Sequence, residues 1–120
     1  MKERNQSELI FRAAAREDVG LILHFIRELA DYEKMLDEGV ADEAALEEGI
    51  FDKQKAEVIF AMTEGKEVGF ALFFHNFSTF LGRAGLYLED LYVLPESRGQ
   101  GYGKALLKEL ATIALDRRCG

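Results

Sequence analysis

Residues 86–107 read LYLEDLYVLPESRGQGYGKALL, and three alternating glycines separate an apolar stretch from a helical repeat. The stretch over 85–94, rich in β-branched and aromatic residues, predicts a strand that stops at Pro95. Apolar residues at three- and four-residue steps predict a helix from Lys104 to about Arg118. Glycine at such a junction lets a ligand approach the backbone, and the free N–H groups of the first helical turn attract anions.

The remaining sequence predicts a mixed α/β domain, because the apolar period alternates between strand and helix types. Asp42 is a candidate N-cap for a short helix that follows the helix at 17–35. In chain order, the expected elements are a strand at 8–14, a helix at 17–35, a helix opening at 42, strands at 57–63 and 67–77, and a loop at 78–84. The strand at 67–77 is apolar on both faces, as expected of a central strand covered by helices on each side.

Length and composition predict one soluble globular domain over residues 1–120. The hydrophobic content is 48% and charged residues make up 31%. No segment approaches the ~18 consecutive apolar residues of a membrane span, so no membrane partner is expected. The polar N-terminus lacks the apolar core of a signal peptide, which favours a cytoplasmic protein. A single cysteine, Cys119, excludes an internal disulfide and a cysteine-rich metal site, and no metal is expected.

The net charge of −7 argues against a nucleic-acid partner, which requires basic surface to neutralise phosphates. The negative excess lies entirely in residues 28–48, which hold nine acidic side chains and one lysine. The rest of the chain holds 13 acidic and 14 basic side chains. This stretch is either a field that attracts a cationic ligand or a solvated helix face.

Two common phosphate-binding motifs do not fit the glycine spacing. Counting back from Lys104, a Walker loop would place its first glycine at Arg98 and its Mg²⁺-binding hydroxyl at Ala105. A dinucleotide fingerprint requires G-x-G-x-x-G, whereas the glycines here run G-x-G-x-G. Taken alone, the glycines indicate either an anion site or a turn that lets the helix pack closely on the sheet.

Three separated motifs carry a resemblance to a known family. RGQGYG at 98–103 resembles the R/Q-x-x-G-x-G/A signature of the GNAT superfamily of acetyl-CoA-dependent N-acyltransferases. Together with ELADYEKM at 28–35 and VGFALFFHNFSTFLGRAGLYLEDLYV at 68–93, it resembles the diamine N-acetyltransferase branch, which includes spermidine/spermine and thialysine acetyltransferases. The likeness runs from about residue 10 to residue 120. It implies a mixed, mostly antiparallel sheet with helices on both faces, lacking the C-terminal strands.

The resemblance also implies acetyl-CoA as co-substrate and a small cationic amine, a polyamine or diamino acid, as acceptor. Glu89 matches the glutamate that accepts the proton of the amine, and Tyr32 and Glu33 match the acceptor-binding pair, with Glu89 contacting the acceptor as well. The resemblance also implies that the pantetheine arm of acetyl-CoA pairs with the backbone of the strand before the loop, and that the pyrophosphate lies on the loop. The residues carried over for the cofactor are Leu91, Tyr92 and Val93 on the strand, and Arg98, Gly99, Gln100, Gly101, Tyr102, Gly103 and Lys104 on the loop.

Glu89 has the chemistry that this role requires. An aliphatic amine with a pKa near ~10.4 arrives protonated and must lose a proton before it attacks a thioester. Without the surrounding motif, Glu89 would be a surface charge at a strand end. In a regular strand, Asp90 would point to the opposite face, so that both carboxylates could not serve one site. No tyrosine is assigned as the acid that protonates the departing thiolate.

The chain ends at Gly120, whereas members of the family that it resembles continue for a few dozen residues beyond this point. Ending there leaves the strand at 85–94 with an unpaired edge, which invites pairing with another chain and predicts a homodimer. An active N-acetyltransferase is the leading prediction. The alternatives are a catalytically inactive CoA-binding or self-associating fragment, and a binder of nucleotide phosphates unrelated to acetyl transfer.

Overall fold

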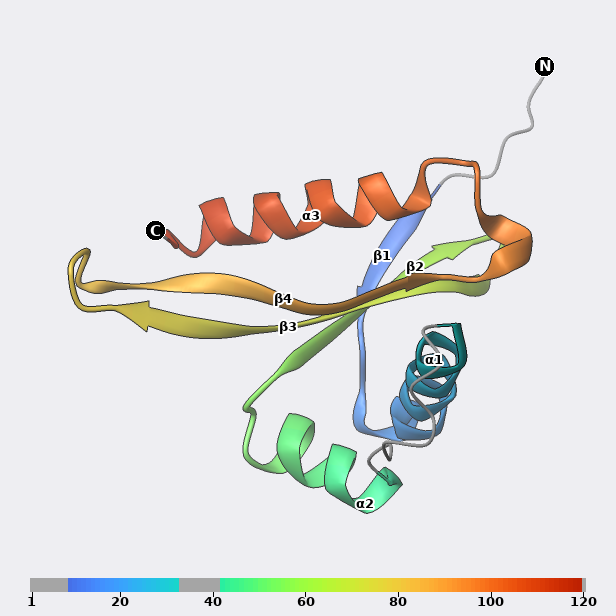
Figure 1. Ribbon diagram of the computed structural model, residues 1–120, viewed down its shortest axis with the longest axis horizontal. Helices are drawn as coiled ribbons and strands as arrows, with labels where there is room; N and C mark the ends of the chain where they lie inside the picture. The colour runs from blue at the N-terminus through green and yellow to red at the C-terminus, as the bar shows by residue number, and fades with distance from the viewer. Residues whose placement is uncertain (1–8, 33–41, 120) are drawn as a thin grey trace.

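The computed structural model describes residues 9–32 and 42–119, which form a four-stranded antiparallel sheet with helices on both faces (Figure 1). This arrangement confirms the predicted fold class. The strands are β1 (Ile10–Ala13), β2 (Glu57–Thr63), β3 (Lys66–Ser78) and β4 (Arg83–Val93). The helices are α1 (Val19–Tyr32), α2 (Glu43–Leu46) and α3 (Tyr102–Asp116), with 3-10 turns at Arg16–Asp18 and Pro95–Ser97 and a π-helical segment at Glu47–Asp52.

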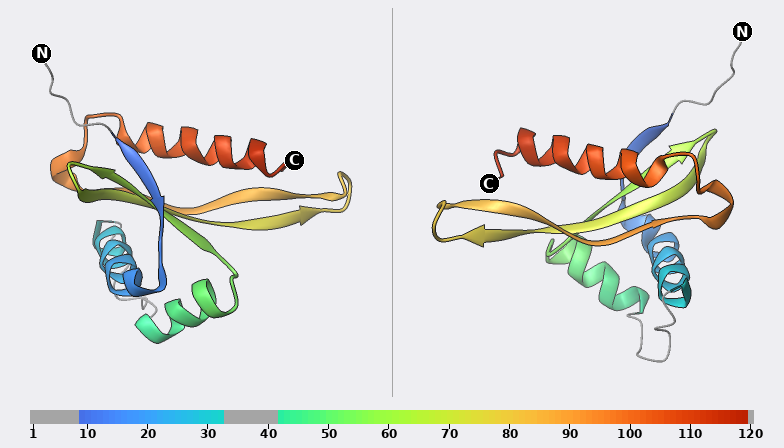
Figure 2. Two further views of the ribbon diagram at one scale, coloured as in Figure 1. Left: turned by 180° about the vertical axis from the view of Figure 1, so that it is seen from behind. Right: turned by 45° about the horizontal axis from the view of Figure 1, so that its top comes forward.

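The strands follow one another in the order β1-β2-β3-β4, so β1 and β4 form the edges of the described sheet. Phe60 on β2 pairs with Phe70 on β3, and Ala71 on β3 pairs with Leu91 on β4. Residues 68–73 of β3 are buried on both faces, as the unbroken apolar run predicts. This double burial arises because β3 lies inside the sheet and is covered by helices on both faces (Figure 2).

The two faces of the sheet carry separate cores, and Figure 2 shows α1 and α2 on one side and α3 on the other. On the α1 side, Phe25 stacks on Phe70 with ring centroids 5.4 Å apart. On the α3 side, Leu106 is fully buried. The buried residues of the α1 side are Ile22, Phe25, Ile50, Val58, Phe60, Phe70, Leu72 and Tyr92. Those of the α3 side are Ile59, Ala61, Val68, Ala71, Phe73, Val93, Leu106 and Leu110.

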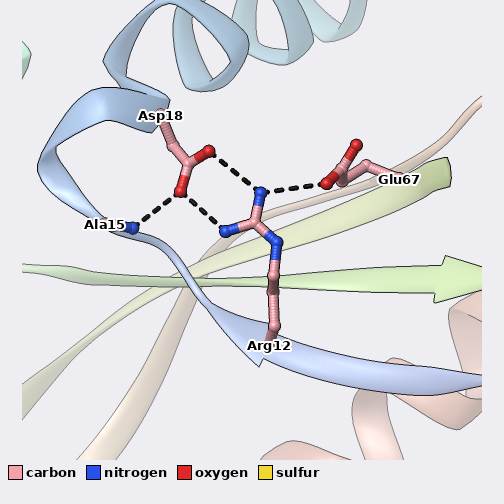
Figure 3. Close-up of polar contacts among 4 residues, drawn as sticks. All are labelled: Arg12, Ala15, Asp18 and Glu67. Carbon is pink, nitrogen blue, oxygen red and sulfur yellow. Dashed lines mark hydrogen bonds and ion pairs between the residues drawn. The ribbon is translucent and has the colours of Figure 1, made fainter. Parts of the chain in front are cut away.

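A charged cluster fixes the start of the first helix to the sheet (Figure 3). Arg12 on β1 donates from Nη1 and Nη2 to the two carboxylate oxygens of Asp18, at 2.7 and 2.9 Å, and from Nη2 to Glu67 on β3 at 2.9 Å. The same Asp18 carboxylate accepts the Ala15 N–H at 2.7 Å. The hydrogen bonds from Arg12 lower the pKa of Asp18, and the two carboxylates raise that of Arg12. The cluster therefore ties the turn before α1 to both β1 and β3.

The element boundaries differ from expectation at three places. The loop expected at 78–84 is a four-residue turn at 79–82, because Ser78 and Arg83 already pair as strand residues. The last helix begins at Tyr102 instead of Lys104. Asp42 caps its helix as predicted, accepting the Ala45 N–H at 2.8 Å, but the winding becomes π-type from Glu47.

The first helix opens with a 3-10 turn and continues as α1 to Tyr32. The end of the helix predicted at 17–35 lies outside the described residues. Across residues 9–32 and 42–119, no helix combines the length and apolar character that a membrane crossing needs.

Candidate active site

The loop between β4 and α3 turns on two glycines with left-handed backbone. Gly99 has a φ of +85° and Gly101 a φ of +80°. Residues with a Cβ rarely adopt these backbone angles, which explains why two of the three alternating positions are glycine. The third, Gly103, lies in the first turn of α3, where a Cβ would stand 3.7 Å from Leu91 and 3.8 Å from Val93.

The start of α3 has no side-chain cap. The first hydrogen bond of this helix start joins the Ala105 N–H to the Gly101 carbonyl at 2.9 Å, so the N–H groups of Tyr102, Gly103 and Lys104 come before it. The first turn contains no acidic residue, and the exposed Lys104 adds positive charge to the positive end of the helix dipole. These groups together suit an anion such as a phosphate.

The end of β4 leads directly into this loop and forms an edge of the sheet. Leu91 and Val93 pack under α3, whereas Tyr92 is buried on the α1 side. Beyond β3, β4 has no other strand neighbour among the described residues. This edge therefore presents backbone groups beside the loop, as pairing with a peptide-like arm requires.

Glu89 lies at a β-bulge in β4. Leu72 pairs with Asp90 and Phe73 with Leu88, so Glu89 is the additional residue opposite β3. Leu88 and Leu91 both pack on the α3 side. Because the alternation of side chains is interrupted between them, Glu89 and Asp90 both face the α1 side. The expectation that Asp90 lies on the opposite face held for a regular strand, and this strand is irregular at Glu89.

The surface around the bulge combines acidic and aromatic side chains. Glu89 is exposed and Asp90 is partly buried. Two residues before Glu89, Tyr87 packs on its strand partner Phe74 with ring centroids 5.0 Å apart, and Tyr87 is half exposed. A cationic group on this face would meet carboxylates and aromatic rings together.

Helix α1 reaches the end of β4 from the other layer. The helix contacts the end of β4 through Phe25, whose ring centroid lies 6.4 Å from that of Tyr92, and Figure 2 shows α1 on the face of the sheet opposite α3. Tyr32 is the last residue of α1, and Glu33 lies outside the described residues. In the described part of the candidate site, Glu89, the end of β4 and the glycine loop follow one another along the chain, and α1 contacts β4 at Tyr92.

The side chain of Arg98, an exposed residue, folds back onto the end of β4. Its Nε donates to the Val93 carbonyl at 2.9 Å, and its guanidinium carbon lies 5.1 Å from the centre of the Tyr92 ring. The Tyr92 hydroxyl in turn donates to Glu28 Oε1 on α1 at 3.1 Å. Glu28 was not predicted as a site residue from the sequence. The feature that could have indicated it is a carboxylate three residues after Phe25, close to the apolar stripe of the helix.

The described residues contain no group of three or more His, Cys, Asp or Glu side chains arranged to hold a metal ion. The polar groups gathered at the loop are backbone N–H donors, and those gathered at the bulge are carboxylates. Such a site can hold an anion beside a strand edge and a cation a few residues away.

Comparison with known proteins identifies the class. Residues 23–120 match the model of the Acetyltransferase (GNAT) family, and the chain belongs to this family. It is an acetyltransferase, which confirms the predicted family and class of enzyme. Among curated proteins, the thialysine N-epsilon-acetyltransferase of Bos taurus is 41% identical over 92% of this chain and 70% of its own length. The spermidine/spermine N(1)-acetyltransferase-like protein 1 of Homo sapiens is 32% identical over 99% of this chain and 18% of its own length.

Solved structures share the fold. A ribosomal-protein-alanine N-acetyltransferase from Brucella melitensis aligns with a TM-score of 0.77 at 22% identity, covering 94% of this chain and 76% of that one. An aminoglycoside acetyltransferase from an uncultured soil sample, in complex with sisomicin, aligns with a TM-score of 0.79 at 20% identity, covering 93% and 73%. At these identities the likeness concerns the fold alone.

Proposed function

We propose that this single domain, residues 1–120, transfers the acetyl group of acetyl-CoA to a primary amine of a small cationic acceptor, a polyamine or a diamino acid. The observation that carries the proposal is the uncapped start of α3 beside the free edge of β4, with Glu89 on a bulge in the same strand. Residues 89–104 thus contain, in chain order, a carboxylate that can accept a proton, a strand edge that can pair with a peptide-like arm and a loop that can bind phosphates. These three features lie within 16 residues.

The donor half of the proposed site consists mainly of backbone. The N–H groups around Gly99, Gly101 and Gly103, together with those of Gln100, Tyr102 and Lys104, bind the pyrophosphate. The backbone of Leu91, Tyr92 and Val93 pairs with the pantetheine arm. Arg98 supports the loop through Val93 and Tyr92. Acetyl-CoA supplies the acetyl group as a thioester.

The acceptor half consists of side chains on the α1 face. Glu89 takes a proton from the ammonium group, directly or through water, so that the amine nitrogen has a lone pair for attack on the thioester carbonyl carbon. The carbon–sulfur bond then breaks, CoA leaves as its thiolate, and the nitrogen of the new amide releases its second proton to the thiolate or to water. Tyr32 and Glu33, in the acidic stretch 28–48, bind the acceptor, and the negative field of that stretch favours an acceptor with more than one cationic group.

Thiol release from acetyl-CoA, measured across a panel of mono-, di- and polyamines, tests this function. We expect release only with amines, fastest with those that carry a second cation. Glu89→Gln, which keeps the shape and removes the base, should lower kcat by roughly 10²- to 10⁴-fold. CoA that binds in calorimetry without any amine-dependent release would instead favour an inactive CoA-binding fragment. ATP binding as tightly as CoA would favour a general phosphate site.

We also propose that the protein forms a homodimer. Support comes from the free edge of β4 and from exposed apolar side chains at the β3–β4 turn, where Phe80 is fully exposed and Leu81 is 57% exposed. Residues 83–88 of β4 remain for such pairing when the last three residues serve acetyl-CoA. Light scattering should give twice the mass of one chain, and a single-chain mass at high concentration would refute the dimer.

A further inference from the structure

A hydrogen bond crosses from α1 to β4 in the core next to the candidate active site. The Tyr92 hydroxyl donates to Glu28 Oε1 at 3.1 Å, and Tyr92 is only 5% exposed. The Tyr92 ring also packs edge-on against Phe25, with centroids 6.4 Å apart. Glu28 stands three residues after Phe25, so both side chains hold one face of α1 against β4.

The same ring continues the connection into the glycine loop. Arg98, the first residue of RGQGYG, lies over the Tyr92 ring at 5.1 Å and donates from Nε to the Val93 carbonyl at 2.9 Å. A cation over a tyrosine face and a hydrogen bond to the strand fix the loop in two directions. Glu28, Tyr92 and Arg98 therefore form a continuous chain from α1 through β4 to the start of the loop.

The chemistry of the central contact makes it persistent. Burial and the hydrogen bond to Glu28 raise the pKa of Tyr92, so its hydroxyl keeps the proton that it donates. Hydrogen bonds with one charged partner contribute more to stability than neutral ones. The contact is therefore present wherever the phenol keeps its proton.

We propose that Glu28 is a positioning residue, which sets the acceptor-binding end of α1 against the donor loop through Tyr92 and Arg98. Glu28 lies one helical turn before Tyr32, the last residue of α1, so a rotation or slide of the helix at Glu28 displaces Tyr32 relative to β4. Transfer needs the amine and the thioester at near-attack distance, and small displacements of either reduce its rate. This inference rests on the proposed function.

The test compares single and double variants of the full chain in amine-dependent CoA release. Tyr92→Phe removes one oxygen and keeps the ring between Phe25 and Arg98. Glu28→Ala removes the acceptor of the same hydrogen bond. We expect each variant to lower kcat on the order of tenfold, with the affinity for CoA in calorimetry within about twofold of wild type. The double variant should be no slower than either single variant, because the two residues act as one unit.

Two further variants separate positioning from loss of folding. Glu28→Gln keeps an acceptor oxygen at the same place and should restore most of kcat. Glu17→Ala removes an exposed glutamate of the preceding 3-10 turn and should leave kcat unchanged. Thermal melts should show that every variant is folded at the assay temperature.

The outcomes distinguish this inference from the proposed function. If wild type is active and the Glu28 and Tyr92 variants keep its kcat, or if their losses simply add in the double variant, the inference is wrong and the proposed function stands. If wild type transfers no acetyl group to any amine, the proposed function is wrong and the inference falls with it.

Discussion

The starts of α1 and α3 differ in how their free N–H groups are satisfied. Before α1, the Asp18 carboxylate accepts the Ala15 N–H and is itself held by Arg12, which also binds Glu67 (Figure 3). Before α3, Gly101 offers no side-chain cap. At the first start a carboxylate of the chain already occupies the adjacent N–H, whereas at the second no carboxylate of the described residues does so. We propose that the first polar cluster serves stability and the second serves binding.

Arg12→Ala should have the largest effect on stability. It leaves the partly buried carboxylates of Asp18 and Glu67 side by side without their cation, at an expected cost of about 3 kcal/mol in the free energy of unfolding. Urea denaturation measures it. Arg16→Ala is the matched control, since the ion pairs of Arg16 with Glu47 and Asp52 are exposed and its guanidinium lies 5.8 Å from the centre of the Phe51 ring, so that the loss should be less than about 1 kcal/mol. Equal losses from the two variants would contradict the account.

Gly101→Ala should have the next largest effect and should act on both stability and binding. Its φ of +80° strains any residue with a Cβ, at roughly 1–2 kcal/mol. Relief of this strain moves the N–H groups at the start of α3, so the affinity for CoA should fall on the order of tenfold, which is about 1.4 kcal/mol. Gly82→Ala, with φ +68° in the distant β3–β4 turn, should show the strain without the loss of affinity. An unchanged affinity in Gly101→Ala would separate the loop from binding.

Acid should weaken the charged cluster before α1. Hydrogen bonds from Arg12 lower the pKa of Asp18 below its ordinary value of 3.8. The contribution of the ionised Asp18 is therefore complete well above pH 3.8 and is lost as the pH falls through the depressed pKa. Asp18→Asn should be less stable than wild type at pH 7, and the gap in the free energy of unfolding should shrink below pH 3.8. A gap that is constant with pH would argue against an ionised Asp18 as its source.

Gly103→Ala should have the smallest effect. An added Cβ would point toward Leu91 and Val93 at ordinary contact distances of 3.7 and 3.8 Å, so no clash results. Alanine is favoured over glycine within a helix by up to about 1 kcal/mol, and stability should be equal or slightly higher. Since the methyl group faces the sheet, CoA affinity in calorimetry should stay within about twofold of wild type. A tenfold loss would show that ligand space extends to this side of the helix.

The fold was predictable wherever the apolar period was long and regular. The double-sided run that becomes β3 and the helical stripe of α3 both follow from periodicity. The hairpin turn was predicted too long, because Ser78, Arg83 and Ala84 continue the strand pairing without being buried deeply. Pairing partners, rather than local composition, decide where such a strand ends.

The site was predictable only in part. The glycine loop is local in sequence, so its spacing already indicated either an anion site at the helix start or a turn that lets the helix pack closely on the sheet. The bulge at Glu89 depends on the register between β3 and β4, and its one-residue shift brings Asp90 to the face of Glu89. The contact between Glu28 and Tyr92 joins residues that are 64 positions apart. The bulge and this contact both depend on which distant segments pair in the fold, so the local sequence pattern does not predict them.

The two helix starts can be compared most directly by amide chemical shifts during a titration with CoA. Binding should shift the resonances of Tyr102, Gly103 and Lys104, whose N–H groups precede the first helical hydrogen bond, and should leave Ala15 and Asp18 unchanged. Shifts confined to other residues, or none at saturating CoA, would contradict the claim that the uncapped start of α3 is the donor site.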